Sequence, residues 1–281
     1  MALLATKILL APLCVVAVSL AGRRWGVATA GVLGGLPVVA GPILLVLTLQ
    51  HGRSFGADAA TGTLLGLAAL TTFVVVYGWV ANHVAPAGSV LAGWAAFLLG
   101  VALLDLVTPG PAPALVFVGC CFAIGLVLLS PPEWPRGEPA APPWWDLPAR
   151  ALAALALVVA VTAASGALGP GLSGLLAPFP IITSVFVFFT HSHRGLHELR
   201  VLSRNFLVGF YGFATFCFVL AIALPGVGTA AAFGLALVAA LAVQITVHLA
   251  RRRLGSADLD REGGDEALAG LDQRQVGAAG D

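Results

Sequence analysis

Two interrupted apolar segments contain the residues best suited to bind a small solute. Both run through glycines to a proline, in GVLGGLPVVAGP (31–42) and GLSGLLAPFP (171–180). Proline removes a backbone donor but is well tolerated in the first turn of a helix. We therefore expect Pro37 and Pro180 each to begin a helix, whose free N–H groups must face protein, water or a ligand. Such helix starts favour an anionic group.

The candidate substrate-binding residues lie at these helix starts and along the helices that follow. Thr183 and Ser184 stand one turn after Pro180 and offer hydroxyl donors, whereas the first segment has Ala40 and Gly41 at the matching positions. The full set is Pro37, Gly41, Pro42, Thr48, Pro180, Thr183, Ser184 and Thr190. The alternative is that these prolines and glycines only kink a helix or allow close packing.

Two titratable residues are candidates for proton coupling. Asp105 is the acid inside a predicted span, and His191 opens the polar sequence HSHRG. An ionisable group within the membrane is a functional hypothesis, and histidine titrates near neutral pH. The alternative for both is a solvated place at the membrane interface. His191 and His193 do not share a helix face, and no Cys/His spacing is typical of zinc, so we expect no metal or cofactor.

The composition indicates an all-α polytopic membrane protein. Of 281 residues, 59% are hydrophobic and 10% are charged, whereas soluble domains have about a quarter of their residues charged. A span needs about 20 apolar residues. The predicted helices, about nine in number, are 4–21, 34–50, 59–81, 87–107, 112–130, 149–166, 174–190, 204–223 and 227–250.

The distribution of positive charge predicts which side each end occupies. With nine helices, Arg23, Arg24, Arg136, Arg150, Arg194, Arg200, Arg204 and Arg251 to Arg253 fall on one side, and only Lys7 and Arg53 on the other. Positive residues mark the cytoplasmic side, so the C-terminus is expected inside a bacterial plasma (inner) membrane. Eight helices, without 112–130, would divide the charges equally well. The length and apolarity of 112–130 favour nine.

An internal repeat relates residue n to residue n+143. Between 26–73 and 169–216 the identities are Gly26, Gly31, Leu33, Pro37, Gly52, Leu64, Gly66, Thr72 and Phe73 with their counterparts. With a linking helix between two groups of four, the second group is inverted, as in many secondary transporters. The predicted parts are a first four-helix repeat (1–110), a linking helix and Pro/Trp-rich cytoplasmic loop (111–148), a second four-helix repeat (149–253) and a disordered acidic tail (254–281).

The stretch GGLPVVAGPILLVLTLQHG (34–52), with the Gly/Thr/Phe-bearing helix that follows it, resembles small bacterial four-helix membrane proteins of the GlpM-like kind. The resemblance covers each half of the chain separately. It implies a four-helix layout and a link to polysaccharide production. It carries no catalytic pattern, and it transfers no substrate and no site residue to this chain.

These features favour a secondary transporter or permease for a small, anionic solute bound near the interrupted second and seventh helices. The alternative is a non-transporting scaffold or accessory component of envelope polysaccharide biogenesis. No paired intramembrane carboxylates and no Ser/His/Asp set occur, so we predict no catalytic residues and no enzyme. The absence of a P-loop disfavours a primary pump. Expected partners are the lipid bilayer and a small solute, with a homodimer left open and no nucleic acid.

Overall fold

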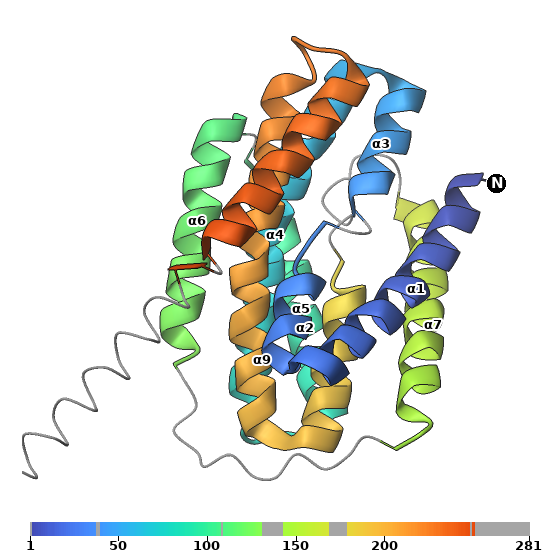
Figure 1. Ribbon diagram of the computed structural model, residues 1–281, viewed down its shortest axis with the longest axis vertical. Coiled ribbons are helices and arrows are strands. Elements are labelled where there is room, and N and C mark those ends of the chain that lie inside the picture. The colour runs from blue at the N-terminus through green and yellow to red at the C-terminus, as the bar shows by residue number, and fades with distance from the viewer. Residues whose placement is uncertain are drawn as a thin grey trace, which may run out of the picture. The chain divides into compact units, whose positions relative to one another are not determined.

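The computed structural model describes residues 2–37, 40–107, 109–130, 143–168, 179–247 and 249–250. These residues form helices joined by short turns, with no strand in the described ranges. The helices are α1 (Ala2–Trp25), α2 (Val27–Gly34), α3 (Ala40–His51), α4 (Arg53–Val80), α5 (Pro86–Leu104), α6 (Pro111–Leu128), α7 (Asp146–Leu168), α9 (Ile181–Ala223) and a last helix, Thr229–Val247 (Figure 1). The chain divides into two compact units, Met1–Leu241 and Ala242–Asp281, and every contact described below lies within the first.

Five of the described helices are long and apolar enough to cross a membrane. They are α4, α5, α6, α9 and the last helix, Thr229–Val247. Large apolar side chains project outward from α5 and α6, among them Leu99, Val116 and Val127, which are 62–75% exposed. Such surfaces are stable in contact with lipid chains rather than water. The predicted all-helical class is confirmed, and several helices have the composition of membrane spans.

Helix α9 is a hairpin with its bend at Gly195. This glycine has φ 78° inside an otherwise helical stretch, a value that L side chains rarely adopt. The rings of Phe186 and Phe206 lie 6.3 Å apart, whereas twenty residues of straight helix would separate them by about 30 Å. The first arm therefore comprises 181–194 and the second 196–223 (Figure 1).

Two predicted helices that fall in this hairpin begin at other residues than predicted. The seventh, predicted at 174–190, is helical from Ile181, and Pro180 immediately precedes it and accepts the N–H of Ser184 at 2.8 Å. Residues 174–178 lie outside the described ranges. The eighth, predicted from 204, begins at 196, because one glycine suffices for the turn and the polar sequence between stays helical.

The second predicted helix, 34–50, corresponds to α3 alone, which begins later than predicted, and α2 precedes it as a helix that was not predicted. Helix α2 ends at Gly34, and α3 begins at Ala40 rather than at Pro37. The Gly35 amide donates back to the Gly31 carbonyl at 3.0 Å, and the Pro37 carbonyl accepts the N–H of Gly41 at 2.8 Å. The interruption predicted from the prolines is therefore present, but a separate short helix precedes it.

Glycines let α2 approach the second arm of α9 at backbone distance. A Cβ added to Gly209 would lie 2.5 Å from the Val32 carbonyl oxygen, and one added to Gly35 would lie 2.8 Å from Gly209 Cα. Both distances are shorter than any Cβ contact allows, so only glycine fits at either position. In this segment the glycines before Pro37 serve close packing, as the alternative interpretation held.

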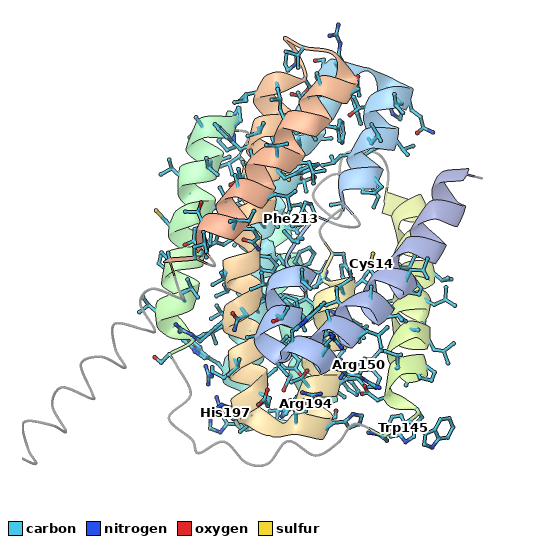
Figure 2. All side chains as sticks on the ribbon, in the orientation of Figure 1. Cys14, Trp145, Arg150, Arg194, His197 and Phe213 are labelled. Atoms are coloured by element: carbon cyan, nitrogen blue, oxygen red, sulfur yellow. The ribbon has the colours of Figure 1, made fainter. Side chains whose placement is uncertain are left out.

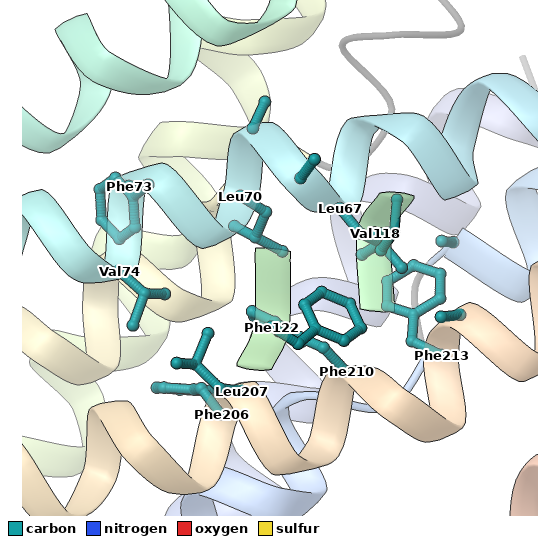
Figure 3. Packing of buried hydrophobic residues seen from close by; sticks show 14 of the residues in the cluster. Leu67, Leu70, Phe73, Val74, Val118, Phe122, Phe206, Leu207, Phe210 and Phe213 are labelled. Carbon is teal, nitrogen blue, oxygen red and sulfur yellow. The ribbon is translucent and has the colours of Figure 1, made fainter. Parts of the chain in front are cut away.

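The core of the first unit lies between α4, α6 and the second arm of α9. Phe122 of α6 contacts Phe210 and Tyr211, with ring centroids 5.9 and 5.1 Å apart. Figure 3 shows side chains of α4 facing this group, and the labelled set is Leu67, Leu70, Phe73, Val74, Val118, Phe122, Phe206, Leu207, Phe210 and Phe213. All are at most 6% exposed. This apolar packing holds the two longest helices together.

Several helix boundaries are separated by 143 residues, the offset of the predicted repeat. Helix α3 and the first arm of α9 end at His51 and Arg194, α4 and the second arm cover 53–80 and 196–223, and α5 and the last helix begin at Pro86 and Thr229. The matched glycines Gly52 and Gly195 both have positive φ, 93° and 78°. Helix α6 has no counterpart in this series.

In two pairs of helices related by the predicted offset, the helices run in opposite directions. The end of α1 contacts the start of α7, because Arg23 bonds Asp146, and the two helices pack side by side. Figure 1 shows the same opposition between α4 and the second arm of α9. A Cβ added to Gly78, near the end of α4, would lie 4.0 Å from Nη1 of Arg200, which is close to the beginning of that arm.

The close approach at Gly209 can be tested by adding one methyl group. We expect Gly209→Ala to lower the stability of the detergent-purified protein by about 1–3 kcal/mol, because the Val32 backbone cannot move aside easily. Gly62→Ala is the control, since no atom lies within 4 Å of its added Cβ and alanine favours a helix by up to about 1 kcal/mol. Thermal unfolding measures both. Equal midpoints for the two variants would contradict the packing described.

Candidate functional site

A buried carboxylate joins three helices at one end of the first unit. Asp146 is 2% exposed, and its Oδ2 accepts hydrogen bonds from Arg150 Nε at 3.0 Å and from Arg23 Nη2 at 3.2 Å. Its Oδ1 lies 3.1 Å from His193 Nδ1. Arg23 belongs to α1, His193 to the first arm of α9, and the other two residues to α7. We call these four residues the Asp146 cluster.

Local helix chemistry places each member. Asp146 is the first residue of α7, where the helix dipole favours a negative charge, and Arg150 follows one turn later on the same face. Arg23 is in the last turn of α1, where a positive charge is favoured. The Arg150 guanidinium also lies over the rings of Phe186 and Phe189, 5.4 and 5.1 Å from their centroids. These cation–π contacts replace water around a side chain that is 6% exposed.

The electrostatics of the cluster keep Asp146 ionised. Burial alone would raise the pKa of this carboxyl group. The hydrogen bond and positive charge of Arg150, together with the hydrogen bonds of Arg23 and His193, outweigh burial and hold the pKa below its ordinary value. Asp146 stands at the first turn of α7, before the apolar stretch that begins at 149.

A cavity of about 30 Å³ adjoins the Asp146 cluster. Its lining residues come from α1, α2, α7 and α9, and are Ser19, Gly22, Arg23, Val27, Ala30, Asp146, Arg150, Phe186, Thr190, Arg194 and Leu202. Figure 2 places Arg150 and Arg194 at the same end of the helices as Trp145. Three guanidinium groups and one carboxylate line the cavity, which leaves a net charge of +2 on its wall.

Two of the lining residues lack an obvious partner. Ser19 is 7% exposed, and its hydroxyl oxygen has no hydrogen-bond partner among the described residues. Arg194 forms no ion pair with any residue in the described ranges. Buried polar groups in folded proteins are nearly always hydrogen-bonded, to protein or to ordered water or a ligand. The cavity therefore presents unused donors beside an excess of positive charge.

Of the predicted substrate-binding residues, Thr190 lines this cavity. Thr183 and Ser184, also buried, lie farther back along the first arm of α9. There the Ser184 hydroxyl accepts a hydrogen bond from Trp94 Nε1 at 2.9 Å. Phe179 packs against the same Trp94 ring, 5.7 Å between centroids, so the residues around Pro180 belong to an aromatic cluster with α5.

The other predicted binding residues lie on α3 and just before it. A Cβ on Gly41 would touch the Phe216 ring at 3.6 Å, and Thr48 donates its hydroxyl to the Leu44 carbonyl at 2.7 Å. Pro37 and Pro42 are half-buried. None of these four lines the cavity that Thr190 borders. The structure thus separates the candidates of the two interrupted segments into different surroundings.

The two proton-coupling candidates do not lie together. His191 Nδ1 is 3.2 Å from the Tyr77 hydroxyl, which donates to the Val187 carbonyl at 3.2 Å. Asp105 caps the C-terminus of α5 and is exposed. It is outside the cavity lining.

Sequence reasoning missed most of the cavity's polar wall. Asp146 fell in the Pro/Trp-rich loop that ends the predicted part 111–148, because the helix was expected to begin at 149 and begins three residues earlier. Arg23, Arg150 and Arg194 entered only as positive charges on one side of the membrane. The spacing of Asp146 and Arg150 was the available signal, since residues four apart share a helix face. No sequence pattern indicated that Ser19 would line the cavity.

Comparison with protein-family models, with curated proteins and with solved structures found no match for this chain. The functional argument therefore rests on the chain's own residues. Within the described ranges no three His, Cys, Asp or Glu side chains come together as metal ligands. The chemistry offered by the cavity is that of guanidinium and hydroxyl donors around one carboxylate.

Removing the Asp146 charge should destabilise the protein. We expect Asp146→Asn to cost about 3 kcal/mol or more, because it leaves Arg150 buried without its counter-charge. Asp105→Asn is the matched control and should change stability by less than about 0.5 kcal/mol, since that side chain is exposed. Thermal unfolding of both variants at neutral pH measures the difference.

The same comparison has a predicted pH dependence. The pKa of Asp146 is lowered on folding, so its contribution is complete above the ordinary carboxyl pKa of about 3.9 and is lost as the pH falls through the lowered value. The gap between wild type and Asp146→Asn should therefore narrow in acid. A gap that stays constant or widens below about pH 4 would show that the carboxylate charge is not its source.

Proposed function

We propose that the protein is a secondary transporter of a small anionic solute, built from two inverted four-helix repeats joined by α6. The recurrence of helix boundaries at one constant offset carries the proposal. Three successive elements, α3 to α5, agree with the two arms of α9 and the last helix at four boundaries across 143 residues, which are 51/194, 53/196, 80/223 and 86/229. Inverted repeats of this kind place the binding site at the contact between halves.

The opposite directions of corresponding helices support inversion rather than a parallel repeat. Inversion requires an odd number of spans per offset, and α6 supplies the additional helix. This helix has 18 residues, no charge and the hydropathy of a membrane span. Nine spans, with the N-terminus outside and the C-terminus in the cytoplasm of a bacterial cell, follow as part of the proposal.

The interruptions support a solute site beside the second and seventh helices. The chain breaks between α2 and α3 around Pro37, and α9 begins after the matching Pro180. The cavity is lined by the helices next to these interruptions, through Val27 and Ala30 of α2 and Phe186 and Thr190 of α9, and not by the interrupted segments themselves. Its net charge of +2 supports an anion as the solute.

The topology can be tested with single cysteines in a background lacking Cys14, Cys120, Cys121 and Cys217. We expect Ala2→Cys to react with an impermeant thiol reagent in intact cells. Ser256→Cys should react only after the membrane is made permeable, because the C-terminus is proposed to be cytoplasmic. Protection at both positions in intact cells would mean an even number of spans and would exclude inverted halves.

Transport can be measured with the purified protein in liposomes. Under an imposed anion gradient, we expect uptake of at least one of nitrate, phosphate or sulfate to exceed that of protein-free liposomes. Arg194→Gln should reduce this uptake, because it removes a cavity charge that no described carboxylate pairs with. Arg24→Gln is the control, since this neighbouring arginine is exposed and outside the cavity lining.

Absence of movement for all anions tested, with folded protein in the liposomes, would sink the transporter proposal. A stable complex with a polysaccharide synthase would then favour the alternative, a scaffold of envelope biogenesis.

A further inference from the structure

We infer that the cavity between α1, α2, α7 and the first arm of α9 binds a small oxyanion through Arg23, Arg150, Arg194 and the Ser19 hydroxyl. Binding at this site depends only on the residues of the cavity, whereas the identity of the bound oxyanion with the transported solute rests on the proposed function.

The charges that line the cavity are unbalanced. Asp146 is the counter-charge of the buried Arg150, so the two positive charges that remain are those of Arg23, whose side chain is 33% exposed, and of Arg194, which is half-buried. Water screens partly buried charges less than fully exposed ones, and an anion in the cavity would supply a counter-charge beside both.

The cavity wall has hydrogen-bond donors that no described protein group uses. The hydrogen bond from Arg150 to Asp146 uses Nε, so the N–H donors of its Nη atoms are left for a ligand. Ser19 is more than nine-tenths buried, lines the cavity and has no partner for its hydroxyl in the described part of the chain. This orphaned hydroxyl is evidence independent of the arginines that the cavity is shaped for a polar occupant.

The size and the donors of the cavity indicate the chemical class of its ligand. A cavity of about 30 Å³ holds two or three water molecules at roughly 10–15 Å³ each, which matches one small anion. Forked guanidinium groups and hydroxyls suit the oxygen atoms of phosphate, sulfate or nitrate. Apart from the Asp146 carboxylate and the Thr190 hydroxyl, the rest of the wall, which includes Val27, Phe186 and Leu202, is apolar. A phosphodiester headgroup of a lipid would present the same chemistry as a free oxyanion.

Asp146 acts as a positioning residue in this site. Its two oxygens hold Arg23 and Arg150 from different helices against one carboxylate, so both guanidinium groups lie beside the cavity. The Phe186 and Phe189 rings fix Arg150 from the other side. The donors are therefore held in place before a ligand arrives, which lowers the entropy cost of binding.

The test is calorimetric titration of the detergent-purified full chain with phosphate, sulfate and nitrate in turn at low ionic strength. We expect at least one to bind, and Arg194→Gln to weaken that binding about tenfold or more, as charge-assisted hydrogen bonds do. Ser19→Ala should weaken it about threefold or more. Arg24→Gln, the exposed neighbour of Arg23, should bind as the wild type does.

A second arm distinguishes a lipid headgroup from a free oxyanion. Native mass spectrometry of protein purified with phosphatidylglycerol reports retained lipid. Retention that phosphate displaces and that Arg194→Gln abolishes assigns the site to the phosphodiester. Binding of phosphate to lipid-free protein, without such retention, assigns it to a free oxyanion. Neither binding nor Arg194-dependent retention, in variants that unfold with the wild-type midpoint, would overturn the site.

Binding and flux separate the two proposals. Oxyanion binding that Arg194→Gln weakens, together with no uptake into liposomes, supports this site and removes the transporter. Uptake that neither Arg194→Gln nor Ser19→Ala changes supports the transporter and shows that this cavity does not bind the transported solute.

Discussion

The arrangement of α1, α7 and the first arm of α9 depends on the hydrogen bonds and ion pairs made by the carboxylate of Asp146. One acid accepts from two arginines and contacts a histidine, and these partners come from three different helices. Burial makes the arrangement demanding, because a charge with a missing partner would be far more costly here than at a surface. The cluster thus fixes which helices meet, and it leaves the adjoining cavity rich in positive charge.

Helix positions followed from sequence to a large extent, because apolar length and proline placement are local properties. Helices α5 and α6 lie within three residues of their predicted bounds, and Pro180 immediately precedes a helix as expected. The short helix α2 was not predicted, since its eight residues are too few for a span and two of them are glycines. Helix α2 is held by a tertiary contact between its backbone and that of Gly209, and no sequence pattern within 27–34 predicts this contact.

The polar site was harder to predict, because its members are far apart in the chain. Arg23 and Asp146 are separated by 123 positions, and each alone reads as an ordinary charge at a helix end. Thr190 was selected for its place after an interrupted helix and lines the cavity. Ser184 was selected for the same reason but is bonded to Trp94. Position along a helix limits the candidates, but the packing of other helices decides which of them reach a cavity.

The one-residue turns at Gly52 and Gly195 have a consequence for how the chain can change in length. Each joins two helices without a loop, so no slack separates the end of one helix from the start of the next. One residue inserted at such a turn would rotate the following helix by about 100° and carry its buried face outward. An insertion at either turn would therefore remove apolar side chains of the following helix, α4 or the second arm of α9, from the core. The lengths of the helices on both sides of Gly52 and Gly195 are thus fixed by the packing of the helices that follow.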